Sequence, residues 1–535
     1  MLPTIMSYAE ILLPQKVGNQ KDTLTYKVPA SLEKIIQKGK IVEIPLRNKK
    51  IRGVVSKLHN DRPPYPTKEI LELAKEATHL QEWQLELISW MADYYFCPAH
   101  RILKQFLPSA IAQKRKLPTY KSSATNEILS QKKLILTAEQ KHAVDTMLGS
   151  DKRLTLLHGI TGSGKTEIYR RLAERELANG KQILILIPEI SLTPQTFAEF
   201  KKEFGGAVAV IHSQLTARAR EEFWYKIYHQ EAKIVVGSRS ALFAPFANLG
   251  LIVMDEEHEP SYKQDQAPRY HARDVALKIS ELLGIKLILG SATPSLESYH
   301  LAIEKRCELI KLKERVKHGG KPQLPTVKIV DLREEIRKKN FSIFSEILQQ
   351  KIAEKLAANE QIILFLNRRG SACAMLCRQC GHIEKCDDCD VAMTYHRNLN
   401  IEHVLLPAER LICHHCNKIK TIPVLCPKCG SSFIRYVGLG TERVEEETKK
   451  LFPEARVLRA DRDTVKARNS FEKIYETFKA HQADILIGTQ MIGKGLHLPQ
   501  VSLVGVVLAD LSLTIPDFRS SERTFQILTQ GAGRA

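Results

Sequence analysis

The chain has 535 residues, too many for one hydrophobic core, and a typical domain of about 100–200 residues predicts several domains. With 43% hydrophobic and 26% charged residues, the composition excludes a disordered or collagen-like protein. Lys and Arg number 80 against 60 Asp and Glu, and the formal charge of +20 favours polyanionic partners such as nucleic acid.

Membrane and secreted proteins are also disfavoured by the sequence. It contains no uninterrupted apolar run near the roughly 18–20 residues that a membrane span requires. Its first residues lack the basic and apolar regions of a secretory signal. We therefore expect an intracellular protein without a membrane partner.

Residues 1–105 are predicted to begin with a small β domain. Two β-like runs, 39–45 and 51–56, flank a short basic turn. Apolar residues at helical spacing follow, and then the aromatic group 94–96, which we expect to lie in the core. The next stretch, 106–133, is rich in Lys and Arg and is interpreted as a basic linker.

From residue 134 onward, strands and helices alternate as in parallel α/β sheets. A helix opens near residue 138, with Thr137 as its N-cap and Gln140 three residues later. Ligands of such sheets bind at the carboxyl ends of the strands. The predicted strands are 154–157, 183–187, 233–236, 251–254 and 286–289 in a first series, and 361–366, 456–458, 484–487 and 503–508 in a second.

A glycine-rich phosphate-binding loop follows the first of these strands. Its glycines let backbone N–H groups point at phosphate oxygens, Lys165 is expected to reach the β/γ-phosphates, and Thr166 to ligate Mg²⁺. A chance match in a glycine-rich turn is the alternative, but it does not predict the acidic motif that comes later. The loop residues are Gly159, Ile160, Thr161, Gly162, Ser163, Gly164, Lys165 and Thr166.

The acidic motif lies at the carboxyl end of the strand 251–254. Asp255 is expected to hold Mg²⁺, and Glu256 to orient and deprotonate the attacking water. The glycine-rich loop and the acidic motif together predict a nucleoside triphosphatase.

Eight of the eleven cysteines form four Cys-x-x-Cys pairs. Two thiolates at this spacing turn toward one tetrahedral Zn²⁺, so four pairs predict two closed sites, with an iron–sulfur cluster as the alternative. The residues alone leave open how the pairs combine. Cys97, Cys307 and Cys373 are expected to be packing residues. The predicted ligands are Cys377, Cys380, Cys386, Cys389, Cys413, Cys416, Cys426 and Cys429.

Further motifs carry a resemblance to a known family. The acidic motif in its Asp-Glu-x-His form, ending at His258, and the motifs at 290–293, 488–495 and 530–534 match the ordered series of superfamily 2 helicases. Within that superfamily, the chain resembles the PriA family of bacterial primosomal replication-restart helicases. The narrower resemblance covers almost the whole chain and rests on residues 187–194, 237–245, 261–264, 268–274 and 517–523 and on the cysteine pairs.

The resemblance implies an α/β protein with two RecA-like parallel-sheet lobes, the second incomplete. It also implies a zinc-ribbon-like insertion, in which the first cysteine pair joins the fourth and the second joins the third. The implied domains are 1–105, which captures a DNA 3′ end; the linker 106–133; lobe 1, the ATP-binding lobe, at 134–312; the first part of lobe 2 at 313–372; the two-zinc insertion at 373–430; and the rest of lobe 2 at 431–535.

The resemblance also implies roles for single residues. Gln140 is implied to recognise adenine, with plain helix capping as the alternative. His258 belongs to the implied catalytic set, as does Arg534, which stabilises transition-state charge from the second lobe. Ser291 and Thr293 are implied to couple the lobes, although Thr293 is alternatively a turn residue.

Residues 261–274 resemble the aromatic-rich loop of the family, which links single-strand binding to ATP hydrolysis. Aromatic and basic side chains suit that role because bases stack on rings regardless of sequence. For Tyr262 and Tyr270, packing of the loop is the alternative. The implied DNA-coupling residues are Tyr262, Lys263, Arg269, Tyr270 and Arg273.

The chain departs from the family pattern in two places. The segment between the N-terminal domain and residue 136 is too short for a winged-helix domain. The sequence also stops at Ala535, inside the last helicase motif, and the second arginine of that motif is missing. We therefore expect that ATP binds while hydrolysis and unwinding are severely impaired.

The implied function is an ATP-dependent 3′–5′ DNA helicase that recognises stalled or abandoned replication forks and initiates primosome assembly for replication restart. The alternatives are a non-catalytic fork-binding scaffold and a translocase that acts on RNA or in restriction. The implied cofactors are ATP, Mg²⁺ and two Zn²⁺, and the implied partners are forked and single-stranded DNA, primosome proteins and single-strand-binding protein. We expect a monomer in the bacterial cytoplasm, associated with the nucleoid.

Overall fold

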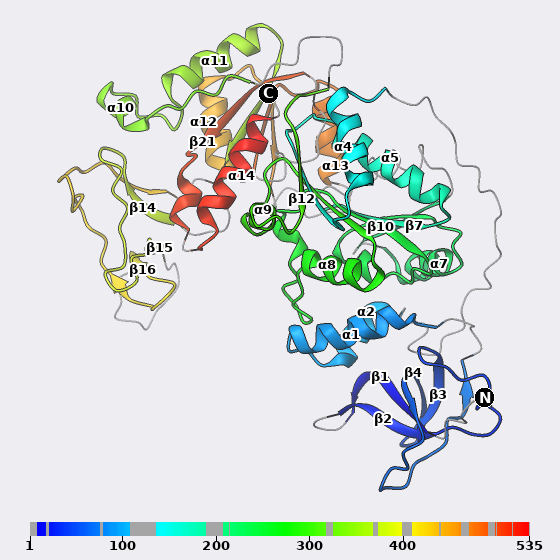
Figure 1. Cartoon of the computed structure of the whole chain (residues 1–535). Helices are drawn as coiled ribbons and strands as arrows, with labels where there is room; N and C mark the ends of the chain where they lie inside the picture. The colour runs from blue at the N-terminus through cyan, green and yellow to red at the C-terminus, as the bar shows by residue number, and fades with distance from the viewer. Residues whose placement is uncertain are drawn as a thin grey trace. The chain divides into compact units, whose positions relative to one another are not determined.

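The computed structural model divides the chain into two compact units, residues 1–316 and 317–535, with the elements labelled in Figure 1. Among the described residues, no helix is both long and apolar enough to cross a lipid bilayer. The described residues are 8–17, 21–74, 79–107, 135–188, 207–212, 215–316, 325–366, 373–397, 409–437, 440–461, 470–489, 498, 500–515 and 517–533.

A five-stranded antiparallel sheet confirms the small β domain expected near the N-terminus. Its strand order is β2-β1-β4-β3-β5. Side chains alternate between its faces, so Ile11 and Leu13 of β1 lie in one core and Leu12 lies in another. The strands are β1 (Tyr8–Val17), β2 (Lys21–Lys27), β3 (Ile41–Leu46), β4 (Lys49–His59) and β5 (Glu72–Leu73).

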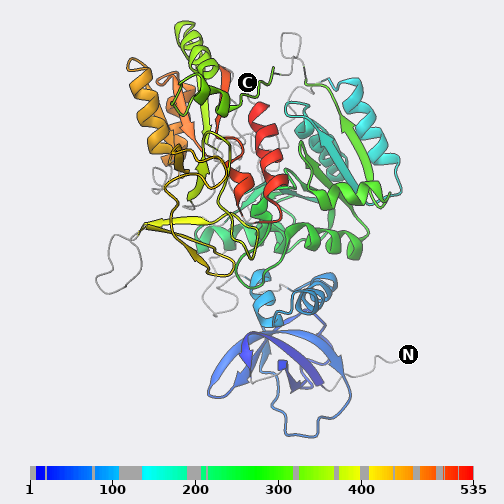
Figure 2. The ribbon, with the colours of Figure 1, turned by 90° about the vertical axis from the view of Figure 1, so that its left-hand side faces the viewer.

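Two helices, α1 (Glu82–Tyr94) and α2 (Ala99–Phe106), lie between this sheet and the rest of the first unit (Figures 1 and 2). They share one hydrophobic core with both neighbours. The expected burial of the aromatic group 94–96 is wrong for two of its members, because Tyr94 is 55% exposed and Phe96 95%. The helix ends at Tyr94, and Phe96 takes a φ of 47° that turns its ring away from the core.

A seven-stranded parallel sheet dominates the first unit, in the order β12-β6-β11-β10-β7-β9-β8. It confirms the five strands predicted there and adds the edge strands β8 and β12. Helices α4 and α5 pack on one face and α7 and α8 on the other, because consecutive apolar side chains of each strand point to opposite faces. The strands are β6 (Leu154–Gly159), β7 (Gln182–Leu186), β8 (Val208–Ile211), β9 (Ile234–Gly237), β10 (Leu249–Met254), β11 (Lys286–Ser291) and β12 (Glu308–Leu312).

The helices of this unit begin where the sequence supplies caps. Thr137 caps α4 and Ser295 caps α9 through side-chain hydrogen bonds from backbone N–H groups. The α-helices around this sheet are α4 (Ala138–Gly149), α5 (Lys165–Ala178), α7 (Ala217–Tyr228), α8 (Ala272–Leu283) and α9 (Leu296–Ile303), and two short 3₁₀ helices are η3 (Arg239–Phe243) and η4 (Pro260–Tyr262).

The second unit contains a four-stranded parallel sheet, in the order β19-β20-β13-β21, which confirms the second predicted series. Helices α11 and α12 share a core on one face, and α13 and α14 on the other. The elements are α10 (Leu332–Arg337), α11 (Glu346–Ala357), β13 (Gln361–Leu366), α12 (Thr441–Leu451), β19 (Val457–Ala460), α13 (Ser470–Lys479), β20 (Ile485–Gly488), β21 (Val501–Val507), η5 (Leu511–Thr514) and α14 (Ser520–Ala532).

A small antiparallel sheet that carries the cysteine pairs is inserted after β13. Its core is little more than the cysteines themselves with Met375, Met393, Leu411 and Ile434. Such a core is too small to stabilise a domain without a structural metal or disulfide bonds. The strands are β14 (Cys373–Cys377), β15 (Thr394–Arg397), β16 (Glu409–Ile412), β17 (Ile419–Lys420) and β18 (Ile434–Val437).

Candidate nucleotide site and cysteine clusters

The glycine-rich loop connects β6 to the N-terminus of α5. Gly162 and Gly164 take φ values of 80° and 75°, a conformation that residues with a side chain rarely adopt. Lys165 opens the helix, and its Nζ donates a hydrogen bond to the carbonyl of Gly159 at 2.9 Å. The N-terminus of α5, which favours a bound anion, therefore begins at this lysine.

Gln140 connects the start of α4 to this loop through the two ends of its amide. Its Oε1 accepts a hydrogen bond from the backbone of Thr137 at 2.9 Å, which completes the expected capping box. Its Nε2 donates to the carbonyl of Ser163 at 3.0 Å. The amide thus fastens the loop to α4, and the implied adenine contact stays a prediction.

Asp255 follows β10 directly, and β10 is separated from β6 only by β11. Tyr169 of α5 donates a hydrogen bond to Asp255 Oδ1 at 2.9 Å. Burial, and then the neighbouring Glu256 carboxylate, raise the pKa of Asp255 to about 6, while the Lys165 ammonium opposes this shift. The structure therefore brings the lysine and the two acidic residues to one edge of the sheet.

His258 connects the acidic motif to the motif after β11. Its Nδ1 lies 2.7 Å from Ser291 Oγ, and its Nε2 lies 3.5 Å from Thr293 Oγ1. Glu256 Oε2 lies 3.6 Å from the same Nδ1 atom. A shift in the position of either motif therefore changes the contacts of the other.

Glu257 was not predicted as a site residue, yet its buried carboxylate accepts three hydrogen bonds. The donors are Ser295 N at 2.6 Å, Ser295 Oγ at 3.0 Å and Ser298 Oγ at 2.7 Å. Arg273 Nη1 donates to Ser295 Oγ at 2.8 Å. Burial raises the pKa of Glu257 despite these donors. No local sequence pattern predicts this network, because Ser295 and Ser298 lie 38 and 41 residues from Glu257.

The loop 261–274 places its aromatic side chains inside the protein. Tyr262 and Tyr270 are each 1% exposed, and Tyr262 Oη donates to the carbonyl of Asp255 at 2.7 Å. Lys263 and Arg269 are exposed, whereas Arg273 is buried in the Glu257 network. The packing alternative thus describes both tyrosines here, and neither ring is available to a base in this conformation.

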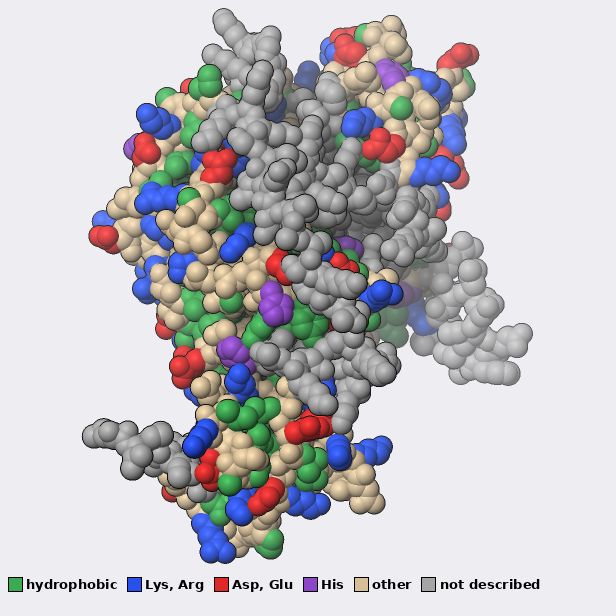
Figure 3. All heavy atoms as spheres, turned by 90° about the vertical axis from the view of Figure 1, so that its right-hand side faces the viewer, with side chains coloured by type: hydrophobic (Ala, Val, Ile, Leu, Met, Phe, Trp, Pro, Cys, Tyr) green, Lys and Arg blue, Asp and Glu red, His purple; other side chains and the backbone are tan. Residues whose placement is uncertain are grey.

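Basic side chains are not gathered into one patch on the face that Figure 3 shows. Described Lys and Arg side chains are interspersed there with Asp and Glu. Several predicted features fall outside the described residues, namely most of the basic linker (108–133), the motif residues 189–194 and 490–495, the side chain of Cys373, and Arg534.

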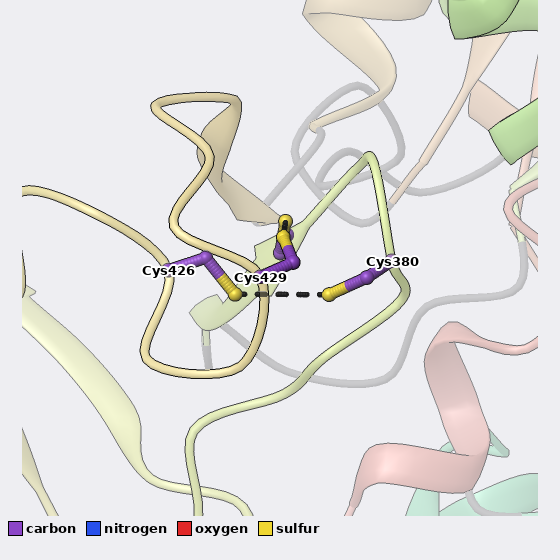
Figure 4. A group of neighbouring side chains, drawn as sticks. Cys380, Cys426 and Cys429 are labelled. Carbon is purple, nitrogen blue, oxygen red and sulfur yellow. Dashed lines mark hydrogen bonds between the residues drawn. The ribbon is translucent and has the colours of Figure 1, made fainter.

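The eight cysteines form two groups of four, and within each group the sulfur atoms lie within 4.8 Å of one another. Cys377 and Cys429 sulfurs are 3.6 Å apart, and those of Cys380 and Cys426 are 3.7 Å apart (Figure 4). These separations are near the ~3.8 Å that four sulfurs around one Zn²⁺ at ~2.3 Å require, and far above a disulfide bond of ~2.05 Å. The second group is Cys386, Cys389, Cys413 and Cys416. The grouping is the nested one that the resemblance implied.

Each cysteine pair is followed by a residue in the left-handed region of φ. Gly381, Asp390, Asn417 and Gly430 have φ values of 75°, 51°, 63° and 69°. Each donates its N–H to the carbonyl of the first cysteine of its pair at 2.8–2.9 Å. Glycine, Asn and Asp tolerate this conformation, so the turn residues fit four metal-binding knuckles. Backbone N–H groups lower the pKa of Cys413 to about 7, whereas the hydrogen bond with the Cys416 thiol raises the pKa of Cys389 to about 12, so the thiols of one group share their protons unequally.

Two protein families match parts of the chain. The model of the DEAD/DEAH box helicases matches residues 137–301, and that of the 3′ DNA-binding domain (3′BD) matches residues 10–108.

Curated relatives match much of the chain. The replication restart protein PriA of Bacillus subtilis is 50% identical over 75% of this chain and 49% of its own length. PriA of Synechocystis is 43% identical over 80% of this chain and 51% of its own length. PriA of Chlamydia pneumoniae is 35% identical over 99% of this chain and 80% of its own length. The chain thus spans about half the length of the first two relatives.

Proposed function

The chain belongs to the family of PriA replication restart proteins, and from that premise we propose that it is an ATP-dependent DNA helicase of replication restart. It moves 3′ to 5′ on DNA at stalled or abandoned forks and initiates primosome assembly there. The single observation that carries the catalytic part is the hydrogen bond from Tyr169 to Asp255. It supports convergence of the phosphate-binding helix and the acidic motif on one nucleotide.

ATP binds with its phosphates against the backbone N–H groups of residues 159–164 and the N-terminus of α5. Lys165 exchanges its bond to the Gly159 carbonyl for the β/γ-phosphates. Thr166 and Asp255 would hold Mg²⁺, which neutralises charge on the phosphates when bound. Glu256 accepts a proton from the attacking water, and Gln140 contributes to adenine recognition.

The contacts of the acidic motif support a route from hydrolysis to motion. His258 is hydrogen-bonded to Ser291 and Thr293 and lies beside Glu256. A shift of Glu256 on hydrolysis therefore moves the segment at the end of β11 through His258. Exposed Lys263 and Arg269 contact the phosphates of single-stranded DNA, since cations provide sequence-independent binding. Tyr262, Tyr270 and Arg273 position loop 261–274 from inside. Arg534 of the second lobe stabilises charge in the transition state.

The domain organisation of the proposed function keeps the expected boundaries except at the end of the insertion. Residues 1–105 bind the 3′ end of a nascent strand, and lobe 1 at 134–312 works with both parts of lobe 2. The insertion was expected at 373–430, and the pairing of β18 with β14 extends it to residue 437; two Zn²⁺ held there would stabilise a fork- and partner-binding surface. Forked DNA, primosome proteins and single-strand-binding protein are the proposed partners, in the bacterial cytoplasm.

ATP turnover by the whole chain, measured with and without forked DNA, tests this proposal. The proposal predicts turnover that rises when forked DNA is added, and such turnover would contradict the severely impaired hydrolysis expected from the motif series alone. Lys165→Ala should abolish turnover while fork binding, followed by fluorescence anisotropy, stays within about twofold of the unmodified chain. Fork binding without any turnover in the unmodified chain would refute the enzymatic proposal and favour the non-catalytic scaffold.

A further inference from the structure

Tyr95, directly after α1, reaches from the N-terminal helices into loop 261–274. Its Oη accepts a hydrogen bond from the backbone N–H of His271 at 3.1 Å. The same hydroxyl donates to Asp274 Oδ2 at 3.3 Å. Lys263 Nζ lies 5.7 Å from the centre of the Tyr95 ring, a cation–π distance. One side chain thus contacts the loop at three points.

The hydroxyl of Tyr95 stays protonated and can therefore donate a hydrogen bond. Burial raises its pKa above the ordinary value, so it keeps its proton throughout the physiological pH range. Trp90 and Tyr94 pack against it, with Tyr94 at 4.9 Å and Trp90 at 6.0 Å between ring centres, both edge to face. The side chain is therefore held from the α1 side by rings and from the loop side by hydrogen bonds.

The other arm of the loop contacts the acidic motif. Within the loop, Lys263 pairs with His271 in a β-bridge, and Gln264 N donates to the carbonyl of Tyr270 at 2.9 Å. These bonds hold residues 263–264 and 270–271, on the two sides of the loop, against each other. Tyr262 Oη then donates to the carbonyl of Asp255 at 2.7 Å. A continuous set of bonds runs from Tyr95 to the backbone of the residue proposed to hold Mg²⁺.

The helix α1, which Tyr95 directly follows, is also part of the N-terminal domain. The match to the 3′ DNA-binding domain covers residues 10–108, and α1 shares a core with Leu12 and Val54 of its sheet. Across the helices, His79 and Tyr228 are hydrogen-bonded at 2.9 Å, and Trp224 Nε1 donates to Phe106 at 3.0 Å. Those bonds anchor the domain to α7, whereas Tyr95 bonds to the loop that contacts Asp255.

We propose that Tyr95 is a positioning residue that couples occupation of the N-terminal domain by a DNA 3′ end to nucleotide binding beside Asp255. The inference rests on the proposed function, because it assigns 3′-end binding to one domain and ATP to the other. It adds a defined physical connection between the two sites. Coupling of this kind is reciprocal, so DNA must alter nucleotide affinity as much as nucleotide alters DNA affinity.

Equilibrium binding to the whole chain tests the coupling without relying on hydrolysis. The probe is a fluorescent, non-hydrolysable ATP analogue with Mg²⁺, titrated in three conditions: without DNA, with a linear single strand, and with a circular single strand that has no 3′ end. In the unmodified chain we expect the linear strand to change the dissociation constant of the analogue by at least about fivefold relative to the circle. In Tyr95→Phe this ratio should fall below about twofold.

Two controls separate coupling from simple loss of structure. Tyr94→Phe removes a neighbouring hydroxyl that has no hydrogen bond among the described residues, and it should keep the full ratio. In Tyr95→Phe, the affinity for the analogue alone and for DNA alone should each stay within about twofold. Should Tyr95→Phe fail to fold, Asp274→Ala removes the acceptor of the Tyr95 hydroxyl and tests the same bond from the loop side.

The outcomes distinguish this inference from the proposed function. If the unmodified chain binds no nucleotide or no DNA, the proposed function fails. If it binds both and the linear strand acts like the circle, or if Tyr95→Phe keeps the full ratio, the role of Tyr95 is refuted while the proposed function stands.

Discussion

Tyr169 donates a hydrogen bond from its hydroxyl to Oδ1 of Asp255 at 2.9 Å. The ring is buried, and burial raises the pKa of Tyr169 well above its ordinary value, so the hydroxyl remains a donor. Lys165 and Tyr169 lie one turn apart on the same face of α5. One helix therefore supplies both the lysine for the phosphates and the group that orients the acidic side chain.

Gly290→Ala is expected to disrupt this arrangement. A methyl group at Gly290 would overlap the Tyr169 hydroxyl and lie 3.3 Å from Asp255 Oδ1. Tyr169 would have to give up its bond to Asp255, and the misplaced carboxylate should lower ATP turnover at least about tenfold. Gly149→Ala is the matched control, because nothing lies within 4 Å of a methyl group there. Unchanged turnover in Gly290→Ala would contradict the role of Tyr169.

Asp255→Asn is expected to stabilise the first unit at neutral pH. Burial and the Glu256 carboxylate raise the pKa of Asp255 from 3.8 to about 6. Because the folded pKa lies above the unfolded one, the ionised carboxylate lowers stability at pH 7, and this loss diminishes as the pH falls from about 6 toward 4. A shift of this size corresponds to roughly 3 kcal/mol.

The stability difference between Asp255→Asn and the unmodified chain is measured by chemical unfolding at several pH values. It should be largest at pH 7, about half as large at pH 5, about one fifth as large at pH 4 and close to zero near pH 3. Asp265→Asn changes an exposed carboxylate and should show no such trend. A difference that is independent of pH would contradict the elevated pKa.

The parallel sheets and the phosphate loop were predictable because local sequence encodes them. Buried strands are unbroken apolar runs such as 251–254, and only glycine easily takes the φ of Gly162 and Gly164. The cysteine pairs were predictable from spacing, although the turn residues Asp390 and Asn417 carried a signal that was missed. The edge strands β8 and β12 were not predicted, although β8 is an unbroken run of four buried residues.

The contacts around the site were not predictable, because they join residues far apart in the chain. Tyr169 and Asp255 are separated by 86 residues, and Tyr95 and His271 by 176. The aromatic group 94–96 was expected in the core on hydrophobicity alone, but the end of α1 determines which rings face inward. For Tyr262 and Tyr270, the family resemblance favoured a DNA-coupling role over packing of the loop, and the burial of both rings supports packing.

Glu257→Ala is expected to destabilise the protein by about 3 kcal/mol. The substitution leaves Ser295, Ser298 and Arg273 without their buried acceptor, and unsatisfied buried donors are costly. Glu257→Gln keeps the shape and one acceptor oxygen, so its loss should be smaller. Urea unfolding followed by circular dichroism measures both. Glu281→Ala, at an exposed site on α8, should stay within about 0.5 kcal/mol; a similar value for Glu257→Ala would refute the structural role of the network.

Removal of metal is expected to unfold the insertion, because four knuckles and few apolar side chains make up its core. The purified chain should contain two Zn²⁺ by elemental analysis, and Cys389→Ser should contain about one. Cys97→Ser changes a buried cysteine outside both groups and should retain two. A strong chelator should accelerate amide hydrogen exchange in residues 373–437 while the four-stranded sheet of the second unit, which has its own cores, stays protected. Iron with visible absorption near 400 nm would instead support the iron–sulfur alternative, and two metals retained in Cys389→Ser would contradict the four-cysteine grouping.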